Sequence, residues 1–323
     1  MITKSFVWGI LPVLAAAANS TFDYNALSLR TVGARNTLDW RIWLEHHNEP
    51  ISFWHDIPLH PSQDKQIINF IVEIPRHTDG KIEIARSEPL NPIFHDARDG
   101  RPRYVESVWP HKSYPFVYGS IPQTWESPNF NHSFTDAPGD NDPVDLFDIG
   151  QDPGFVGQVK RVKVLGALAL RDGGETDWKV LGIDVDDPIA SLVDDFNDVD
   201  KYRPGLIDSY RDWFTYYKVP RGDALIPIVN NTYVNATFAT SIIAQSHTYW
   251  LDLVKGAVDS NEINYNQTSR PDIPGSFVSR YNATAHLGLP AQSDELPAQP
   301  KLERYEQWFY LDGGYGVIGE NVV

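Results

Sequence analysis

The amino-acid sequence predicts a mainly β protein of the α+β class, in which a small closed barrel is surrounded by a few helices and long loops. Short apolar segments with strand-like patterns, separated by Gly, Pro and Asn, dominate the first half of the chain. Helical periodicity of apolar residues begins only after about residue 204. With 323 residues, 41% of them hydrophobic, the chain can bury a large core.

Four segments predict strands. Residues 67–74 are mostly apolar and run into Pro75, which has no backbone N–H to donate. Residues 81–85 alternate between polar and apolar, so Lys81 and Glu83 should share one face of a strand.

The other two predicted strands come later. Residues 155–170 suit one long strand or a bent pair, with Gly157 and Gly166 as expected kinks or bulges. Residues 178–185 form the next apolar run.

Two helices follow the predicted strands. Apolar residues at helical spacing predict one over residues 204–218, ended by Pro220, and another from about 238 to 258. Residues 259–300 are rich in Pro, Asn, Ser and Asp, which indicates long surface loops.

The chain shows no internal repeat, so we expect a single domain over residues 19–323 with a loop-rich C-terminal part at about 259–303. After Arg304, a cluster of aromatic residues supplies enough apolar surface to dock the tail on the body.

Residues 1–18 have the pattern of a secretory signal peptide. Lys4 gives a basic start, residues 5–18 are mostly apolar, and the alanines at 15–18 offer small residues for cleavage. The apolar run is too short to span a bilayer. The alternative is an uncleaved N-terminal tail.

N-glycosylation sequons support a secreted protein. Four of them fall between residues 230 and 284, which is typical of a glycosylated surface. The sequons begin at Asn19, Asn131, Asn230, Asn235, Asn266 and Asn282. There is no cysteine, so stability must come from the core, from bound metal or from an oligomer interface.

The net charge of −16 argues against nucleic acid as a partner, because a phosphate backbone requires a basic face. A small phosphate substrate remains compatible with this charge if bound metal ions reverse the local field. We expect no membrane contact after removal of the signal peptide.

The segment around Asp140, Asp142 and Asp145 is the strongest functional signal. These carboxylates fall within six residues, in a turn stiffened by Gly139 and Pro143, and they repel one another unless a cation lies between them. Oxygen ligands alone favour Mg²⁺ or Ca²⁺ over zinc. The segment fails the EF-hand pattern, and a solvated acidic loop is the alternative.

Further acids and a matching set of cations and phenols lie elsewhere in the chain. Carboxylates can hold divalent ions against phosphate oxygens, while Lys and Arg neutralise a leaving phosphate. This mixture suits hydrolysis of a phosphoanhydride, although each residue alone has a more ordinary interpretation. The additional acids are Glu73, Glu83, Asp172 and Asp177; the cations and phenols are Lys81, Arg103, Lys179, Lys218, Tyr114, Tyr118 and Tyr217.

Several segments, in order along the chain, resemble soluble family I inorganic pyrophosphatases of the fungal and animal branch. Residues 140–146, with the sequence DNDPVDL, are similar to the family signature. The resemblance covers roughly residues 30–220 and is weaker near 240–255 and 304–311. The other similar segments are residues 33–38, 55–59, 72–76, 118–126, 173–179 and 213–218.

The resemblance implies a site that uses two to four Mg²⁺ ions. The ligands of the tighter ion would be Asp140, Asp145 and Asp177, with Asp145 shared between two ions. Ions that arrive with the substrate would be held by Glu83 and Asp172. Asp142 resembles the base that orients and deprotonates the attacking water.

The resemblance also implies how pyrophosphate is held. One phosphate would be gripped by Arg103, Tyr217 and Lys218, and the other by Lys81 and Tyr118. Tyr114 stands where the family has a tyrosine proposed to donate a proton. Supporting polar positions are matched by Glu73, Asp96 and Lys179. No functional position departs from the family pattern.

The implied fold is a five-stranded closed barrel of the OB type, with the site on its open face, in a homodimer. The implied reaction is hydrolysis of pyrophosphate to two phosphates by in-line attack of a metal-bridging hydroxide. Two alternatives stay open: a secreted metal-dependent phosphohydrolase of broader range, acting on short polyphosphate or nucleotides, and a non-catalytic OB-like module that binds polyanions or oligosaccharides.

Overall fold

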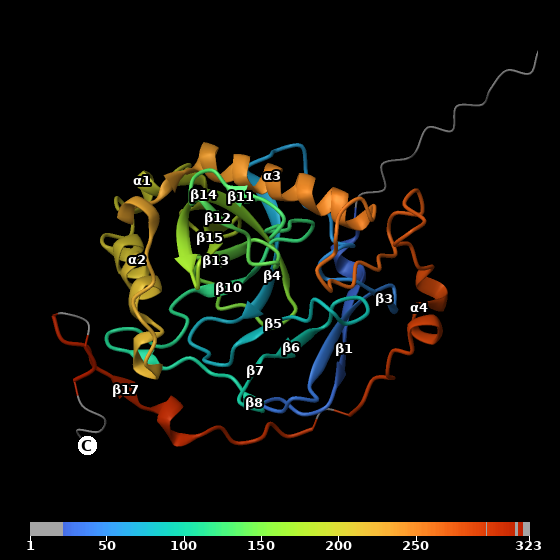
Figure 1. Ribbon diagram of the computed structural model, residues 1–323, viewed down its shortest axis with the longest axis horizontal. Helices are drawn as coiled ribbons and strands as arrows, with labels where there is room; N and C mark the ends of the chain where they lie inside the picture. Colours follow the sequence, from blue (N-terminus) through green and yellow to red (C-terminus); the bar gives the residue numbers. More distant parts are fainter. Residues whose placement is uncertain (1–21, 295, 314–315, 319–323) are drawn as a thin grey trace, which may run out of the picture.

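A sheet that closes on itself forms the centre of the molecule (Figure 1). The computed structural model describes residues 22–294, 296–313 and 316–318. The strands of the ring are β4 (Ile67–Ile74), β10 (Val117–Ser120), β13 (Asp145–Asp148), β14 (Val159–Asp172) and β15 (Glu175–Asp184). Because β14 pairs with both β4 and β15, the order β15-β13-β10-β4-β14 closes. The predicted five-stranded OB-like barrel is confirmed.

All four predicted strand segments form strands. The predicted limits of β4 agree with the structure, and β14 and β15 are each displaced by a few residues. The predicted bulge at Gly166 is present as a register shift against β15. A Cβ at Gly166 would lie 2.6 Å from the carbonyl oxygen of Val234 on the adjoining strand β16 (Val234–Asn235), so a side chain there would collide with backbone. Gly157 lies in the turn before β14 instead of inside it.

A second sheet, ordered β1-β2-β6-β5 with β3 beside β2, lies next to the barrel. Only one of its strands, β5, was predicted. Its strands are β1 (Leu27–Val32), β2 (Arg41–His46), β3 (Glu49–Ile51), β5 (Ile82–Ile84) and β6 (Ile93–His95). Short strands pair off as β7 (Ala97–Arg98) with β8 (Arg101–Pro102), β9 (Ser107–Val108) with β17 (Trp308–Phe309), and β11 (Asn131–His132) with β12 (Ala137–Pro138).

Both predicted helices are present. The first is α2 (Leu206–Tyr216), and the second is α3 (Ala236–Val254), which ends four residues early because Gly256 adopts a left-handed conformation with φ +66°. Figure 1 shows α3 across the top of the barrel and α2 along its side. The remaining helical segments are α1 (Phe196–Val199), α4 (Arg280–Leu287) and the 3-10 turns Tyr24–Ala26, Ala190–Leu192, Val219–Arg221, Val229–Asn231 and Glu303–Glu306.

The prediction of long surface loops over residues 259–300 is partly wrong. This segment contains α4, and it is anchored to the body through buried Asp56. Asp56 accepts hydrogen bonds from the backbone N–H of Thr268 (2.7 Å) and Ser269 (2.9 Å). The polar composition therefore reflects buried hydrogen bonds as well as solvent exposure.

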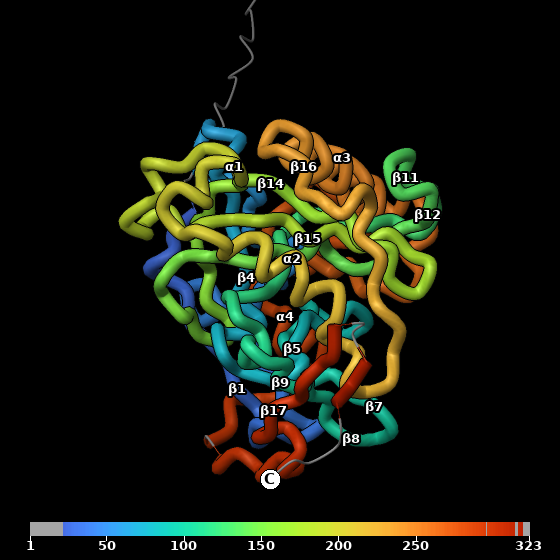
Figure 2. Tube along the Cα trace, turned by 90° about the vertical axis from the view of Figure 1, so that its left-hand side faces the viewer, coloured from blue at the N-terminus to red at the C-terminus, as the bar shows by residue number. Residues whose placement is uncertain are grey.

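The tail docks as predicted. Trp308–Phe309 pairs in parallel with Ser107–Val108. Figure 2 shows β7, β8, β9 and β17 gathered at one end of the molecule, away from α3.

All five ring strands contribute side chains to one buried hydrophobic cluster, which α3 completes with Ala239, Ile242 and Ile243. Residues from every strand of a closed ring can meet in this way only when each strand turns one face inward. Outside this cluster, Phe147 of β13 and Phe116, which directly precedes β10, contact Phe214 of α2.

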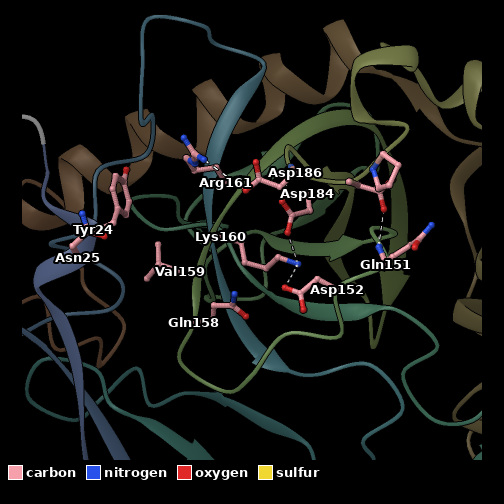
Figure 3. Close-up of a pocket in the computed structure, with 12 residues that line it drawn as sticks. Tyr24, Asn25, Gln151, Asp152, Gln158, Val159, Lys160, Arg161, Asp184 and Asp186 are labelled. Carbon is pink, nitrogen blue, oxygen red and sulfur yellow. Dashed lines mark hydrogen bonds and ion pairs between the residues drawn. The ribbon is translucent and has the colours of Figure 1, made fainter.

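The parallel pairing of β13 and β15 separates two polar regions. Asp145 and Lys179 face each other near the start of these strands, whereas Asp148 and Asp184 lie near their ends. There, buried Lys160 Nζ lies 2.7 Å from an oxygen of each of these two aspartates. Figure 3 shows Lys160 between Asp184 and Asp152 at a cavity of about 590 Å³. The single charge of Lys160 is shared between these carboxylates, so we interpret this cluster as a structural ion-pair network.

Among the described residues, no helix combines the length and the apolar character needed to cross a membrane. The predicted signal peptide and the sequon at Asn19 lie outside the described residues.

Candidate active site

One cavity of about 400 Å³, at the start of β13 and β15, collects every predicted site residue except Glu73. The predicted residues that line it are Lys81, Glu83, Asp96, Arg103, Tyr114, Tyr118, Asp140, Asp142, Asp145, Asp172, Asp177, Lys179, Tyr217 and Lys218. Glu73 is buried behind them, where its Oε1 accepts a hydrogen bond from Ser120 Oγ at 2.9 Å.

The acidic loop between β12 and β13 is held in place by hydrogen bonds. Asn141 has a left-handed conformation (φ 70°), and its Oδ1 accepts a hydrogen bond from Trp125 Nε1 at 3.0 Å. The backbone N–H of Glu126 donates to the carbonyl of Asp142 at 2.9 Å. Both aspartates flanking Asn141 are thereby directed into the cavity, which excludes a freely solvated loop.

Three carboxylates, those of Glu126, Asp140 and Asp177, place one oxygen each within 4.8 Å of one another. Glu126 is buried, and its Oε2 has no hydrogen-bond partner. A buried carboxylate oxygen without a partner is costly unless a cation or a proton neutralises it. Glu126 ends the family-like segment 118–126, but the sequence predicts no role for it.

Burial and mutual repulsion control the protonation of these acids. Burial, and then the neighbouring acids, raise the pKa of Glu126 and of Asp140 well above the usual range. The pKa of Asp177 is also raised, mainly by burial. Although 45% of the Asp142 side chain is exposed to the cavity, the surrounding protein and then Glu83 raise its pKa to about 7. The cavity therefore favours an arriving cation.

Lys179 joins the acids to the phenols. Its Nζ lies 2.5 Å from Asp177 Oδ1 and 2.9 Å from Tyr118 O–H, and it also contacts Asp145 Oδ2, to which Tyr118 donates. Burial alone would lower the pKa of Lys179, but Asp145 and Asp177 raise it well above its usual value. Lys179 therefore stays charged.

The remaining predicted cations each face an acid. Lys81 Nζ lies 2.6 Å from Glu83, and Arg103 Nη1 lies 2.7 Å from Asp96. Lys218 Nζ contacts Asp172 Oδ2, yet burial outweighs this partner and lowers the pKa of Lys218.

Three tyrosines supply uncharged hydrogen-bond donors to the cavity. Burial raises the pKa of Tyr114, Tyr118 and Tyr217, so their hydroxyl groups keep their protons at neutral pH. The Tyr217 ring stacks on Trp213, with 4.4 Å between ring centroids, which orients it at the end of α2.

Carboxylates for hard cations thus lie beside cations and hydroxyl donors for phosphate oxygens. A family model for inorganic pyrophosphatase matches residues 70–251. The inorganic pyrophosphatase of Zygosaccharomyces bailii is 44% identical over 286 residues, which span 88% of this chain and 98% of that protein. The chain belongs to the inorganic pyrophosphatase family.

Solved structures agree with this pyrophosphatase assignment. The inorganic pyrophosphatase from Schistosoma japonicum has a TM-score of 0.81 at 38% identity, covering 88% of this chain and 99% of that chain. The N-terminally truncated vacuolar soluble pyrophosphatase of Trypanosoma cruzi, solved in complex with PPi, has a TM-score of 0.67 at 35% identity over 79% of this chain and all of its own.

The pyrophosphatase cavity also contains residues that sequence reasoning did not select. Arg86 Nη1 donates to Asp142 Oδ1 at 3.1 Å, from the loop that follows β5. Glu175, whose position in the turn after Asp172 could have marked it, also lines the cavity, as do Trp213 and Phe214.

Proposed function

We propose that this chain hydrolyses inorganic pyrophosphate to two phosphates with the help of a divalent cation, generally Mg²⁺. The observation that carries the proposal is the set of side chains that line the cavity of about 400 Å³ in this family member. Eight carboxylates, five Lys or Arg side chains and three tyrosines line it. Neither a polyanion-binding module nor a broad phosphohydrolase is favoured by the comparisons.

The residues present fit a hard divalent cation. The acidic side chains that line the cavity offer oxygen ligands, and no His lines it. Glu126 lies close enough to Asp140 and Asp177 to share an ion with them, and its Oε2 has no hydrogen-bond partner among the described residues. Asp140, Asp145 and Asp177 would hold the tighter ion, while Glu83 and Asp172 would hold ions that accompany the substrate, to a total of two to four. When bound, Mg²⁺ supplies positive charge to the phosphate oxygens and makes water more acidic.

The chain's own residues would perform the remaining steps. The carboxylate of Asp142 accepts the proton of the attacking water, and a pKa near 7 suits a base at neutral pH. Arg103 and Lys218 neutralise one phosphate with hydrogen bonds from Tyr217, and Lys81 and Tyr118 orient the other. Tyr114 can donate its hydroxyl proton to the leaving phosphate.

A phosphate-release assay tests this function. Release from pyrophosphate should require Mg²⁺ and stop on addition of a chelator. The same assay with tripolyphosphate and ATP, first with Mg²⁺ and then with Zn²⁺, measures substrate range. Release from all three substrates at similar rates with Mg²⁺ would contradict pyrophosphate as the substrate.

We further propose a homodimer. Trp109 is 57% exposed and Tyr310 is 48% exposed. At the docked tail, the Trp109 ring makes an edge contact with Trp308 and stacks on Tyr310. Aromatic side chains of this kind are typical anchors of protein interfaces. Sedimentation equilibrium should give twice the chain mass, and Trp109→Glu should give the mass of one chain.

The proposal of a secreted glycoprotein rests on the N-terminal pattern and on the sequons. Asn131, Asn230, Asn235 and Asn282 are exposed. Asn266 differs, because Thr268 of its sequon is buried with its hydroxyl on Asp56 at 3.0 Å. The mass of the native protein should fall on removal of glycans; an unchanged mass would contradict secretion through a glycosylating pathway.

A further inference from the structure

A groove of about 1090 Å³ adjoins the catalytic cavity and shares Arg103 with it. Three segments form its walls: the β7–β8 hairpin, the 3-10 turn Val219–Arg221 that follows Lys218, and the C-terminal segment at residues 300–305. In Figures 1 and 2 the hairpin lies at the same end of the molecule as this segment. Two of the groove's walls therefore continue directly into the residues proposed to grip one phosphate.

The groove is cationic in an otherwise acidic chain. Six of its lining residues are Lys or Arg and two are acids, whereas the catalytic cavity has eight acids and five cations. The basic residues are Arg98, Arg101, Arg103, Arg221, Lys301 and Arg304.

Some of these cations hold the groove together. Arg304 Nη2 lies 2.8 Å from Glu106, Arg221 Nη2 lies 2.6 Å from Asp223, and Lys301 contacts Asp79. These pairs fix the C-terminal segment and the 3-10 turn in place, so the walls are built before any ligand arrives.

Other donors in the groove are unpaired among the described residues or only weakly paired. The Arg101 side chain has no ion pair or hydrogen bond with the described residues, and Arg98 Nη2 comes no closer than 4.0 Å to Asp223. At the shared wall, the buried Nε of Arg103 donates to no acceptor that the structure describes. Guanidinium groups with free N–H donors bind phosphate oxyanions through paired hydrogen bonds.

We propose that this groove binds inorganic phosphate and guides phosphate anions between solvent and the Arg103 side of the catalytic cavity. The inference rests on the proposed function, since hydrolysis leaves one phosphate beside Arg103, Tyr217 and Lys218. Carboxylates repel a phosphate dianion elsewhere around the cavity, and the groove offers it compensating charge.

The test uses the double variant Arg98→Gln, Arg101→Gln. Both residues are exposed on the β7–β8 hairpin and lie outside the catalytic machinery. The matched control is Arg161→Gln with Lys201→Gln, which removes the same charge from exposed positions away from the groove. In the groove variant, the inhibition constant of inorganic phosphate should rise roughly three- to tenfold over the control. The value of kcat/KM for pyrophosphate should fall at low ionic strength and approach the control value at high salt, with kcat unchanged.

Equal inhibition constants of inorganic phosphate in the groove variant and the control would overturn the proposal. A lower kcat/KM alone would not support it, because long-range electrostatic attraction of pyrophosphate would explain that change. If the wild-type chain releases no phosphate from pyrophosphate, the proposed function fails. The groove is then tested by calorimetric titration of the metal-free protein with inorganic phosphate, where weaker binding by the groove variant supports it and equal affinity overturns it.

Discussion

Asp142 lies at the point where the acids of the cavity meet its cations. Its carboxylate faces Glu83, Asp145 and Arg86, and its pKa of about 7 reflects burial more than any one neighbour. We expect Asp142→Asn to lower kcat by about 10²- to 10⁴-fold, because an amide cannot accept the proton of water. Steady-state phosphate release measures this.

Asp186→Asn is a suitable control for that substitution, since Asp186 is 82% exposed beside the cavity of Figure 3. Turnover of Asp142→Asn within threefold of this control would rule out Asp142 as the base.

Glu126 provides a second test at the residue scale. Burial and the adjoining acids keep its pKa well above the usual range, which favours the protonated carboxyl in the metal-free protein. Glu126→Gln should therefore change the melting temperature in chelator very little. Mg²⁺ affinity should fall by roughly tenfold or more, because an amide carries no charge for the ion.

Calorimetric titration with Mg²⁺ measures the affinity, and Glu303→Gln, at an exposed position, controls for net charge. An affinity equal to that of Glu303→Gln would show that Glu126 is not a ligand.

The candidate site was largely predictable at the residue scale, because the segments that carry it resemble a family in order along the chain. Glu126 was not selected, since only the fold brings it within 4.8 Å of Asp140 and Asp177. Arg86 was not selected because its distance from Asp142 depends on how the loop after β5 turns. Long-range juxtaposition of this kind is not encoded in local spacing.

At the scale of elements, α3 begins with a side-chain cap. Asn235 Oδ1 accepts the backbone N–H of Phe238 at 2.9 Å, which satisfies a donor that the first turn leaves unpaired. Asn235→Ala should lower the free energy of unfolding by about 1 kcal/mol. Denaturation by urea measures this in protein made without glycosylation.

Asn282→Ala is the matched control, because it also removes a sequon but lies inside α4 and caps no helix. Equal decreases in the free energy of unfolding of Asn235→Ala and Asn282→Ala would mean that the side-chain cap contributes no stability.

Elements with strong periodic patterns were predicted well, and short ones were not. β4 has a nearly continuous apolar sequence that ends at Pro75, so local pattern and tertiary position agree. β1 contains polar residues at alternate positions and is only partly buried, so its strand character depends on pairing with β2. The helix α4 was missed because its sequence has weak amphipathic character and begins within a polar segment.

At the scale of the whole molecule, the raised pKa values link stability to pH and to metal. Below about pH 3 these carboxyls are largely protonated in both states. As pH rises toward 7, the unfolded chain releases protons that folded Asp142, Asp140 and Glu126 retain, because their pKa values are raised. The contribution of these three carboxyls to the free energy of unfolding of the metal-free protein should therefore fall as pH rises through this window, whereas buried histidines with lowered pKa values contribute in the opposite direction.

Mg²⁺ should reverse this trend, because it replaces the protons at the site. At about 100 times its Kd, Mg²⁺ should add about 2.7 kcal/mol of stability, and the apparent Kd should decrease as pH rises. Melting temperatures at pH 5.5 and pH 8, with chelator and with Mg²⁺, measure both effects. A change in melting temperature between pH 5.5 and pH 8 that is the same in metal-free wild type and in metal-free Asp142→Asn would contradict the account.

The register of β15 has a consequence for folding. Asp145 lies opposite Lys179 on one side of this strand, and Asp177 lies opposite Leu170 on the other. A slip of one residue at either seam would rotate these charged groups to the wrong face. During refolding, enzymatic activity can thus return only after β15 has paired in the correct register with both β13 and β14. The time course of regained activity therefore reports when the native topology is complete. Circular dichroism reports only when strands form.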